Sequence, residues 1–472
     1  MRILFLRMAS YFNERNAHPE NVMMPVDIGI MATIADQMGH ETLLIDTEAE
    51  AWTLDSLAAR IRDLRPGLIF LKAKSPSNRQ VFSLFRHPDL RDLDTEIIGF
   101  SHAFGESPET FLISDIPVSC VIVREPEATM REVLSKWTDG SWRAVRGIAY
   151  RHEDQVIRTE ERELLDDLDE LPVPKYDWFL NSRYFTYYPM PPFIRKKVGF
   201  MLAGRGCPKT CIYCSPTLRQ TYGAKFRAHS VERIVDEMEY LRSRGVRVVQ
   251  FRDDLFTLDR LFVERLCQRI LSRGLKLSWI AQTHVNHVDE KLLALMKSAG
   301  CITLGFGIES GSERVLSVLK KHNNLQHARG VFAICRRLGI RTVGFFLVGC
   351  PGETLQEVVK TRSLIRELSP DLIQVALFTP YKGSKAFDFI DKSSAEKSAD
   401  FHHYNKIVHN FSSIDLKTLE DLPKRLYLEY IFTPRVFLRL ALGSIAGIVV
   451  DPVLTLRMIV SGFRFLVLRK RN

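Results

Sequence analysis

In the stretch Gly204-Arg205-Gly206-Cys207-Pro208-Lys209-Thr210-Cys211-Ile212-Tyr213-Cys214, three cysteines stand within eight residues. A short apolar run precedes this stretch, so we expect the cysteines in a loop at the end of a strand. Spacings of three residues and then two allow all three thiolates to turn toward one centre, and the glycines let the backbone wrap closely around it. Thiolates are the ligands of iron–sulfur clusters, and three of them leave one iron of a four-iron cluster open.

The rest of the sequence favours a cluster over a zinc site or a disulfide framework. A structural zinc site would need a fourth Cys or His nearby, and the nearest downstream histidine, His229, stands at the start of a predicted helix. The other cysteines are scattered through apolar segments, unlike those of small secreted proteins. The apolar run before Arg7 is too short for a signal peptide. We therefore expect a [4Fe-4S] cluster on Cys207, Cys211 and Cys214 in a reducing, cytoplasmic protein.

Strands and helices alternate on both sides of the cysteine motif. Six strand–helix units from residue 198 onward predict a partial (β/α)6 barrel, with its chemistry at the C-terminal ends of the strands. The first part of the chain predicts a Rossmann-like, flavodoxin-like parallel sheet with helices on both faces. The barrel strands are expected at Gly199–Ala203, Val246–Phe251, Leu277–Ala281, Ile302–Gly307, Thr342–Val348 and Leu372–Phe378.

Composition divides the chain into four parts. We expect an N-terminal domain at 1–140, an acidic and proline-rich linker at 141–195, the barrel at 196–395 and a helical, apolar C-terminal region at 396–472. The apolar fraction of 46% is that of a packed soluble protein. The net charge of +10 comes without a basic run interleaved with aromatics, so we expect no nucleic-acid partner.

The cysteine spacing, with Tyr213 before the last cysteine, resembles the signature of the radical S-adenosylmethionine (SAM) superfamily. This resemblance implies that the open iron chelates the amino and carboxylate groups of SAM. It also implies that the reduced cluster cleaves SAM to methionine and a 5′-deoxyadenosyl radical, which abstracts a hydrogen atom from the substrate. An electron donor such as flavodoxin or ferredoxin would reduce the cluster.

Carboxylates at two later strand ends are candidates for binding SAM. Asp253 and Asp254 resemble a DDxF sequence that lies near the methionine amino group in the family. Adjacent residues of a strand point in opposite directions, so only one of the two need face the site, and either could instead cap a helix. Glu309 and Ser310 end a glycine-rich strand, where a buried carboxylate needs a partner such as the ribose hydroxyls.

Two further positions complete the expected SAM site. Gly349 lies in the stretch 344–354, which resembles the family's fifth-strand motif that packs against adenine; a buried strand with a glycine turn is the alternative. Gln282 ends the third barrel strand and is a polar candidate.

Residues 1–135 resemble the cobalamin-binding domain that precedes many radical SAM enzymes, through the stretches 25–29, 39–46, 65–70 and 125–129. The Asp-x-His-x-x-Gly motif that supplies a cobalt ligand elsewhere is absent, and Arg124 replaces a usual glycine. The resemblance implies either a corrin bound without a protein histidine or a domain that has lost its ligand. The corrin contacts would be Lys74, Ser75, Ser77, Ser101, His102, Glu127 and Thr129.

The C-terminal region is apolar but interrupted by arginines. Its longest unbroken apolar run, Leu440–Val450, is shorter than the ~18–20 residues of a transmembrane helix. Two interpretations remain open from the sequence. The segment either lies on an anionic membrane surface as a peripheral, amphipathic helix, or packs on the barrel or a second subunit.

The resemblance implies a cobalamin-dependent radical SAM enzyme that methylates an unactivated carbon of a hydrophobic or natural-product substrate. Cob(I)alamin would take a methyl group from one SAM, and a second SAM would give the radical.

The first alternative is a ring-forming enzyme like the anaerobic magnesium-protoporphyrin ester cyclase. A methylthiotransferase is disfavoured, since Cys120 alone cannot hold a second cluster in the N-terminal domain. An alternative of another class is a non-catalytic B12- or redox-sensing membrane adaptor.

Overall fold

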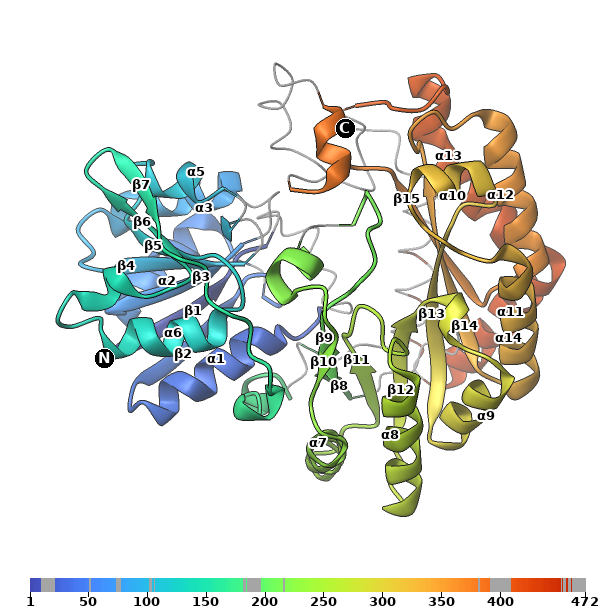
Figure 1. Cartoon of the computed structure of the whole chain (residues 1–472), viewed down its shortest axis with the longest axis horizontal. Coiled ribbons are helices and arrows are strands. Elements are labelled where there is room, and N and C mark those ends of the chain that lie inside the picture. The colour runs from blue at the N-terminus through green and yellow to red at the C-terminus, as the bar shows by residue number, and fades with distance from the viewer. Residues whose placement is uncertain are drawn as a thin grey trace.

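The computed structural model has two α/β units side by side, followed by C-terminal helices (Figure 1). It describes residues 1–9, 22–50, 52–73, 78–101, 104–105, 107–180, 184, 197–214, 217–380, 383–390 and 409–450, together with 452, 456 and 460.

The N-terminal unit is built on a seven-stranded sheet of order β2-β1-β3-β4-β5-β6-β7, in which β1 to β5 are parallel. Its parallel part has the strand order of flavodoxin-like folds, which confirms the expected Rossmann-like class. The strands are β1 (Arg2–Arg7), β2 (Glu41–Asp46), β3 (Leu68–Lys72), β4 (Glu96–Phe100), β5 (Val118–Ile122), β6 (Ile148–His152) and β7 (Gln155–Arg158).

Helices cover both faces of this sheet, which explains why its strands are continuous apolar runs. In β1, Ile3 and Phe5 join one core cluster and Leu4 and Leu6 the other. Helices α1 and α6 contribute to the first cluster, and α2, α3 and α5 to the second. The helices are α1 (Val26–Gln37), α2 (Leu54–Leu64), α3 (Asn78–Phe85), α5 (Pro108–Leu112) and α6 (Pro126–Ser135).

The hairpin β6–β7 corrects the expected boundary of the linker. Residues 148–158 lie within the range expected to be a linker, yet β6 pairs antiparallel with β5 and β7 pairs with β6. The hairpin covers the edge of β5, whose backbone groups would otherwise be exposed. The N-terminal unit therefore extends beyond residue 140.

The second unit is a partial barrel of six parallel strands in the order β15-β14-β13-β12-β11-β8. Each strand overlaps one of the six apolar runs identified in the sequence, so the expected barrel is confirmed. The strands are β8 (Val198–Met201), β11 (Val248–Phe251), β12 (Ser278–Thr283), β13 (Cys301–Glu309), β14 (Arg341–Val348) and β15 (Leu372–Leu377).

Helices form the outer layer of the barrel (Figure 1). Ser230 and Asp289 cap α7 and α9: Ser230 accepts from the Arg233 N–H, and Asp289 from the Leu292 N–H. The helices are α7 (Val231–Ser243), α8 (Arg260–Ser272), α9 (Glu290–Ser298), α10 (Glu313–Val318), α11 (Leu325–Leu338), α12 (Leu355–Leu368), α13 (Leu416–Ile431) and α14 (Pro434–Val450). No helix formed by the described residues is long and apolar enough to cross a membrane.

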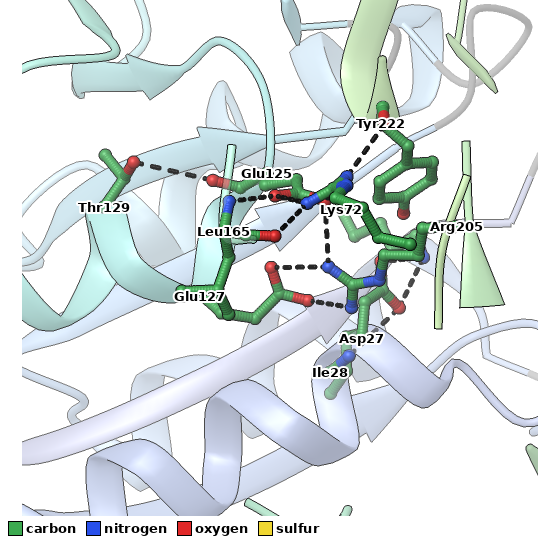
Figure 2. Close-up of polar contacts among 10 residues, drawn as sticks. Asp27, Ile28, Lys72, Glu125, Glu127, Thr129, Leu165, Arg205 and Tyr222 are labelled. Carbon is green, nitrogen blue, oxygen red and sulfur yellow. Dashed lines mark hydrogen bonds and ion pairs between the residues drawn. The ribbon is translucent and has the colours of Figure 1, made fainter. Parts of the chain in front are cut away.

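A short antiparallel ribbon joins the two units. It consists of β9 (Gly204–Arg205) and β10 (Arg227–Ala228), and both strands carry an arginine toward the N-terminal unit. Arg205 donates to the two Glu127 oxygens at 2.6 and 3.2 Å, and Arg227 donates to the two Glu125 oxygens at 2.6 and 3.1 Å. Figure 2 shows these glutamates at the start of α6, with Arg205 beneath the ring of Tyr222.

These interdomain ion pairs are excluded from water. The four side chains are at most 8% exposed. Bidentate arginine–carboxylate pairs are directional as well as attractive, so they set both the separation and the orientation of their partners. A third pair, within the N-terminal unit, joins Lys72 at the end of β3 to Asp27 at 2.5 Å and lies beside them (Figure 2).

We predict that Glu127→Gln destabilises the folded protein by about 3 kcal/mol, because it leaves a buried arginine without its bidentate partner. Urea unfolding measures the change. The control is Glu160→Gln, whose partner Arg146 is exposed, and it should change the unfolding midpoint little. Equal midpoints for Glu127→Gln and the wild type would contradict this account of the joint.

Candidate functional site

A cavity of about 600 Å³ opens at the C-terminal ends of the barrel strands. The loop after β9 and the ends of β11, β12, β13 and β14 supply most of its wall. Cys207, Cys211 and Cys214 all line it, as do five other residues used below: Tyr213, Asp254, Gln282, Glu309 and Lys321.

Backbone contacts hold the cysteine loop in shape. Gly206 has φ +97°, and a Cβ there would lie 2.1 Å from the Lys225 carbonyl oxygen, so the position requires glycine. The Cys207 N–H donates to the Gly223 carbonyl at 3.2 Å, and the Ile212 N–H donates to the Leu319 carbonyl at 3.1 Å. The loop is therefore tied to two other segments of the barrel.

The three thiols are partly buried in one wall of the cavity. Burial raises the pKa of Cys207 and Cys211, and that of Cys214 to about 12, so metal binding must displace protons. Within the described ranges, no three His, Cys, Asp or Glu side chains converge on a point that could hold one metal ion. A four-iron cluster takes each thiolate at a different iron, so three thiols in the wall of one cavity suit it.

Glu309 is the most constrained acidic residue of the cavity. It has φ +65°, which is rare for a residue with a side chain, and it follows a register shift in the pairing of β13 with β14. Its carboxylate accepts from the Tyr213 hydroxyl at 2.9 Å and lies 3.4 Å from the Lys321 ammonium. Asn323 donates to the carbonyls of residues 307 and 308 at 2.9 and 2.8 Å, which holds the strand end in place.

The two adjacent aspartates divide their roles, as expected for neighbouring residues of a strand. Asp254 lines the cavity, where burial raises its pKa to about 7 despite the positive charge of Arg252. Asp253 points away and accepts the N–H groups of Ala203 and Gly204 at 3.0 and 2.5 Å. Asp253 therefore positions the chain just before the cysteine loop and does not contact the cavity.

Residues 201–365, which include this cavity, match the model of the radical SAM superfamily. The barrel is a radical SAM domain. The resemblance inferred from the three cysteines is therefore confirmed.

Two relatives match most of the chain. It is 26% identical over 420 residues to an uncharacterized methyltransferase of Pyrococcus horikoshii, covering 88% of this chain and 89% of that protein. It is 25% identical over 421 residues to the anaerobic magnesium-protoporphyrin IX monomethyl ester cyclase of Rubrivivax gelatinosus, covering 86% and 72%. The names of these relatives correspond to the two enzyme activities that the sequence left open.

The two-domain fold also matches a solved structure. This is the radical SAM methyltransferase TsrM from Kitasatospora setae with cobalamin and a [4Fe-4S] cluster bound. The TM-score is 0.63 at 17% identity, covering 80% of this chain and 72% of that one. The likeness shows that the N-terminal Rossmann-like unit and the radical SAM domain occur together in that fold.

Besides Asp253, two predicted SAM contacts lie outside the cavity wall of the radical SAM domain, Ser310 and Gly349. The Ser310 side chain is fully buried and contacts Thr361 Oγ1 at 3.2 Å. Gly349 has φ +80° and donates its N–H to Glu353 Oε2 at 2.7 Å, in a turn that packs on Leu419. Both residues support the ends of β13 and β14. Tyr213, Asp254, Gln282 and Glu309 do line the cavity.

The sequence analysis missed several residues of the cavity. Lys321 follows α10 and reaches Glu309 only through the fold. Phe345 on β14 and His284 after β12 also line the wall, and burial lowers the pKa of His284 to about 3, so it is neutral. Gly307 could have been recognised from the glycine-rich end of its strand, and in the structure a Cβ there would lie 2.5 Å from Glu309 Oε1.

Several residues of the N-terminal unit were predicted to contact a corrin. Those that the structure describes contact other groups of the protein. Lys74, Ser75, Ser77 and His102 lie outside the described residues. Ser101, at the end of β4, donates to the Ala73 carbonyl at 2.6 Å. Glu127 is bound to Arg205, and Thr129 is buried with its hydroxyl 3.5 Å from the Glu125 carbonyl oxygen. Glu127 therefore belongs to the domain joint, and Thr129 lies one helical turn from Glu125 inside the N-terminal unit.

We predict that Cys207→Ala, Cys211→Ala and Cys214→Ala each abolish the four-iron cluster in anaerobically reconstituted protein, because each removes one of three ligands. Iron content and the visible absorption spectrum measure the effect. Cys120→Ala in β5 removes a buried thiol far from the cavity and should retain full iron content. A normal cluster in any of the three loop variants would refute the ligand assignment.

Proposed function

We propose that the protein is a cobalamin-dependent radical SAM enzyme that methylates an unactivated carbon of a small, hydrophobic substrate. The observation that carries this proposal is the convergence of three thiols with Glu309, Asp254 and Lys321 in one cavity of a radical SAM domain. The preceding Rossmann-like unit, the Pyrococcus horikoshii relative and the TsrM fold support methyl transfer, while the cyclase relative supports the ring-forming alternative.

The residues of the cavity fit a cluster with SAM beside it. Cys207, Cys211 and Cys214 would hold the cluster. When bound together and reduced by an electron donor such as flavodoxin or ferredoxin, the cluster and SAM supply a radical that takes a hydrogen atom from the substrate. Carboxylates attract ammonium groups and accept from hydroxyls, so Asp254 suits the methionine amino group and Glu309 suits the ribose.

Contacts within the protein hold these groups in place before any ligand binds. Tyr213 and Lys321 hold the Glu309 carboxylate, and the backbone of Glu309 is held in its left-handed conformation by the Asn323 contacts. A binding group that is already oriented loses little entropy on binding, which favours affinity. Phe345 adds an apolar surface on the same wall, suited to a flat aromatic ring such as adenine.

The support for cobalamin binding comes from the orientation of the N-terminal sheet. Glu125, which follows β5, contacts the ribbon of the barrel unit, so the carboxyl edge of the N-terminal sheet faces the radical SAM domain. Ligands of such sheets bind at this edge. Glu127 and Thr129 are already engaged, so a corrin would rest on the other residues of the edge. If bound there, the corrin would supply the methyl group.

We also propose that the C-terminal helices make a peripheral contact with a membrane surface. This contact would place the enzyme near an apolar substrate. The exposed apolar face of α14 supports this part of the proposal.

We predict that Glu309→Gln weakens SAM binding by about ten- to a hundredfold, since a hydrogen bond to a charged group contributes about 1.5–3 kcal/mol. Isothermal titration calorimetry on cluster-loaded protein measures this effect, and iron content should stay at the wild-type level. Glu313→Gln, an exposed acid in the first turn of α10, is the matched control and should bind normally. Unchanged affinity in Glu309→Gln would assign Glu309 a purely structural role.

The reaction itself can be tested with reconstituted protein, SAM, a reductant and extracts of hydrophobic metabolites under anaerobic conditions. We expect 5′-deoxyadenosine together with a product heavier than its substrate by one CH2 unit. Without cobalamin, 5′-deoxyadenosine should still form while the heavier product disappears. Cys214→Ala should give neither.

The other outcomes of this assay identify the alternatives. Formation of 5′-deoxyadenosine with a product that gains no CH2 unit would favour a ring-forming enzyme. Bound cofactors without any 5′-deoxyadenosine would favour a non-catalytic adaptor.

A further inference from the structure

A second cavity, of about 420 Å³, lies among the outer helices of the barrel. It shares no residue with the cavity that holds the cysteines. Its wall comes from α11, α12, α13 and the first turn of α14, so it is built from the same helices that carry the apolar C-terminal region.

Positive charge dominates the wall of this cavity. Four arginines line it, from three helices: Arg336, Arg362, Arg366 and Arg435. Of its two glutamates, Glu429 is shared between Arg362 and Arg366, and Glu367 pairs with Arg329, which lies outside the wall.

Two of the arginines, Arg336 and Arg435, lie close enough for their positive charges to interact. Burial and then the nearby positive charge of Arg435 lower the pKa of Arg336. Within the described part of the chain, neither Arg336 nor Arg435 has a carboxylate at ion-pair distance. The first turn of α14 also lines the cavity and adds the positive end of a helix of 17 residues. An anion in this cavity would relieve the repulsion between the two arginines.

The exposed apolar face of α14 begins next to the arginine cavity. Leu438, Leu442, Ile445 and Val449 recur at helical spacing, and they are between 58% and 80% exposed. The opposite face of α14 is anchored to the barrel, since Val436 is buried and Arg439 donates to Asp371 at 2.6 Å.

Aromatic side chains lie beside the arginine cavity as well. Phe432 and Phe437 are both exposed and stacked, with their ring centroids 6.4 Å apart. They flank Thr433 and Arg435, which belong to the wall of the cavity. Aromatic rings next to basic groups are typical of segments that lie at a membrane interface.

We propose that this arginine cavity binds the phosphate of an anionic phospholipid headgroup while the apolar face of α14 lies among the acyl chains. The inference rests on the membrane contact proposed above and deepens it, because it names the site and the charge of the lipid. Guanidinium groups suit phosphate geometry, and the apolar stripe that starts at the cavity suits the chains attached to that phosphate.

The test is co-sedimentation of full-length, cluster-loaded protein with two kinds of vesicle. One kind is phosphatidylcholine alone, and the other contains phosphatidylglycerol as well. We expect preferential binding to the phosphatidylglycerol vesicles at low salt, and weaker binding at high salt. The variant R336Q/R435Q should bind these vesicles on the order of tenfold more weakly, because it removes two charges at the lipid surface.

A matched control removes the same charge elsewhere. R242Q/R265Q replaces two exposed arginines on α7 and α8, and it should bind the vesicles as the wild type does. Far-UV circular dichroism and iron content verify that each variant is folded. Formation of 5′-deoxyadenosine in solution should be unchanged in all of them, which separates the lipid site from the proposed reaction.

Three results would overturn the proposal. If R336Q/R435Q bound the phosphatidylglycerol vesicles as strongly as the wild type, the headgroup site would be excluded, although the membrane contact would not. If the wild type bound neither kind of vesicle, both the headgroup site and the membrane contact would be excluded. A wild-type dimer that L438S/L442S converts to a monomer in sedimentation velocity would show that the apolar face meets a second copy of the chain.

Discussion

The pairing of Arg205 with Glu127 is the interaction on which the arrangement of this protein most depends. Arg205 lies two residues before Cys207, and its partner opens the first helix after β5 in the other domain. The same short segment therefore connects the two sheets and begins the cysteine loop. Because the pair is buried and bidentate, the position of the loop relative to the N-terminal sheet has little freedom.

Neighbouring contacts extend this constraint into the cavity. Asp253 holds the two backbone N–H groups just before Arg205, and Gly206 makes the tight turn just after it. Further along, the Tyr213 hydroxyl meets Glu309 from β13. Polar contacts thus hold the cysteine loop on two sides, at Arg205 toward α6 and at Tyr213 toward the cavity wall.

The sequence predicted most of the fold because the strands are buried on both faces and therefore read as unbroken apolar runs. The hairpin β6–β7 was missed because its strands are half exposed and lie just before a stretch rich in acids and prolines. The cysteines were found from their local spacing. The partner of Glu127 could not be found, since 78 residues separate it from Arg205. Ser310 and Gly349 lie outside the cavity wall, since proximity along the chain does not indicate which side of a strand end faces a cavity.

The left-handed backbone at Glu309 has a consequence for how this protein would change under selection. A side chain at φ +65° carries a conformational cost that glycine does not. Replacement by glycine would relax the strand end and, at the same time, delete the carboxylate from the cavity. Two effects on stability therefore oppose each other at this one position, since glycine removes the backbone cost but leaves the Lys321 ammonium without its carboxylate. Selection for stability alone would be divided between the two residues, whereas a need to bind a ligand would preserve the acid.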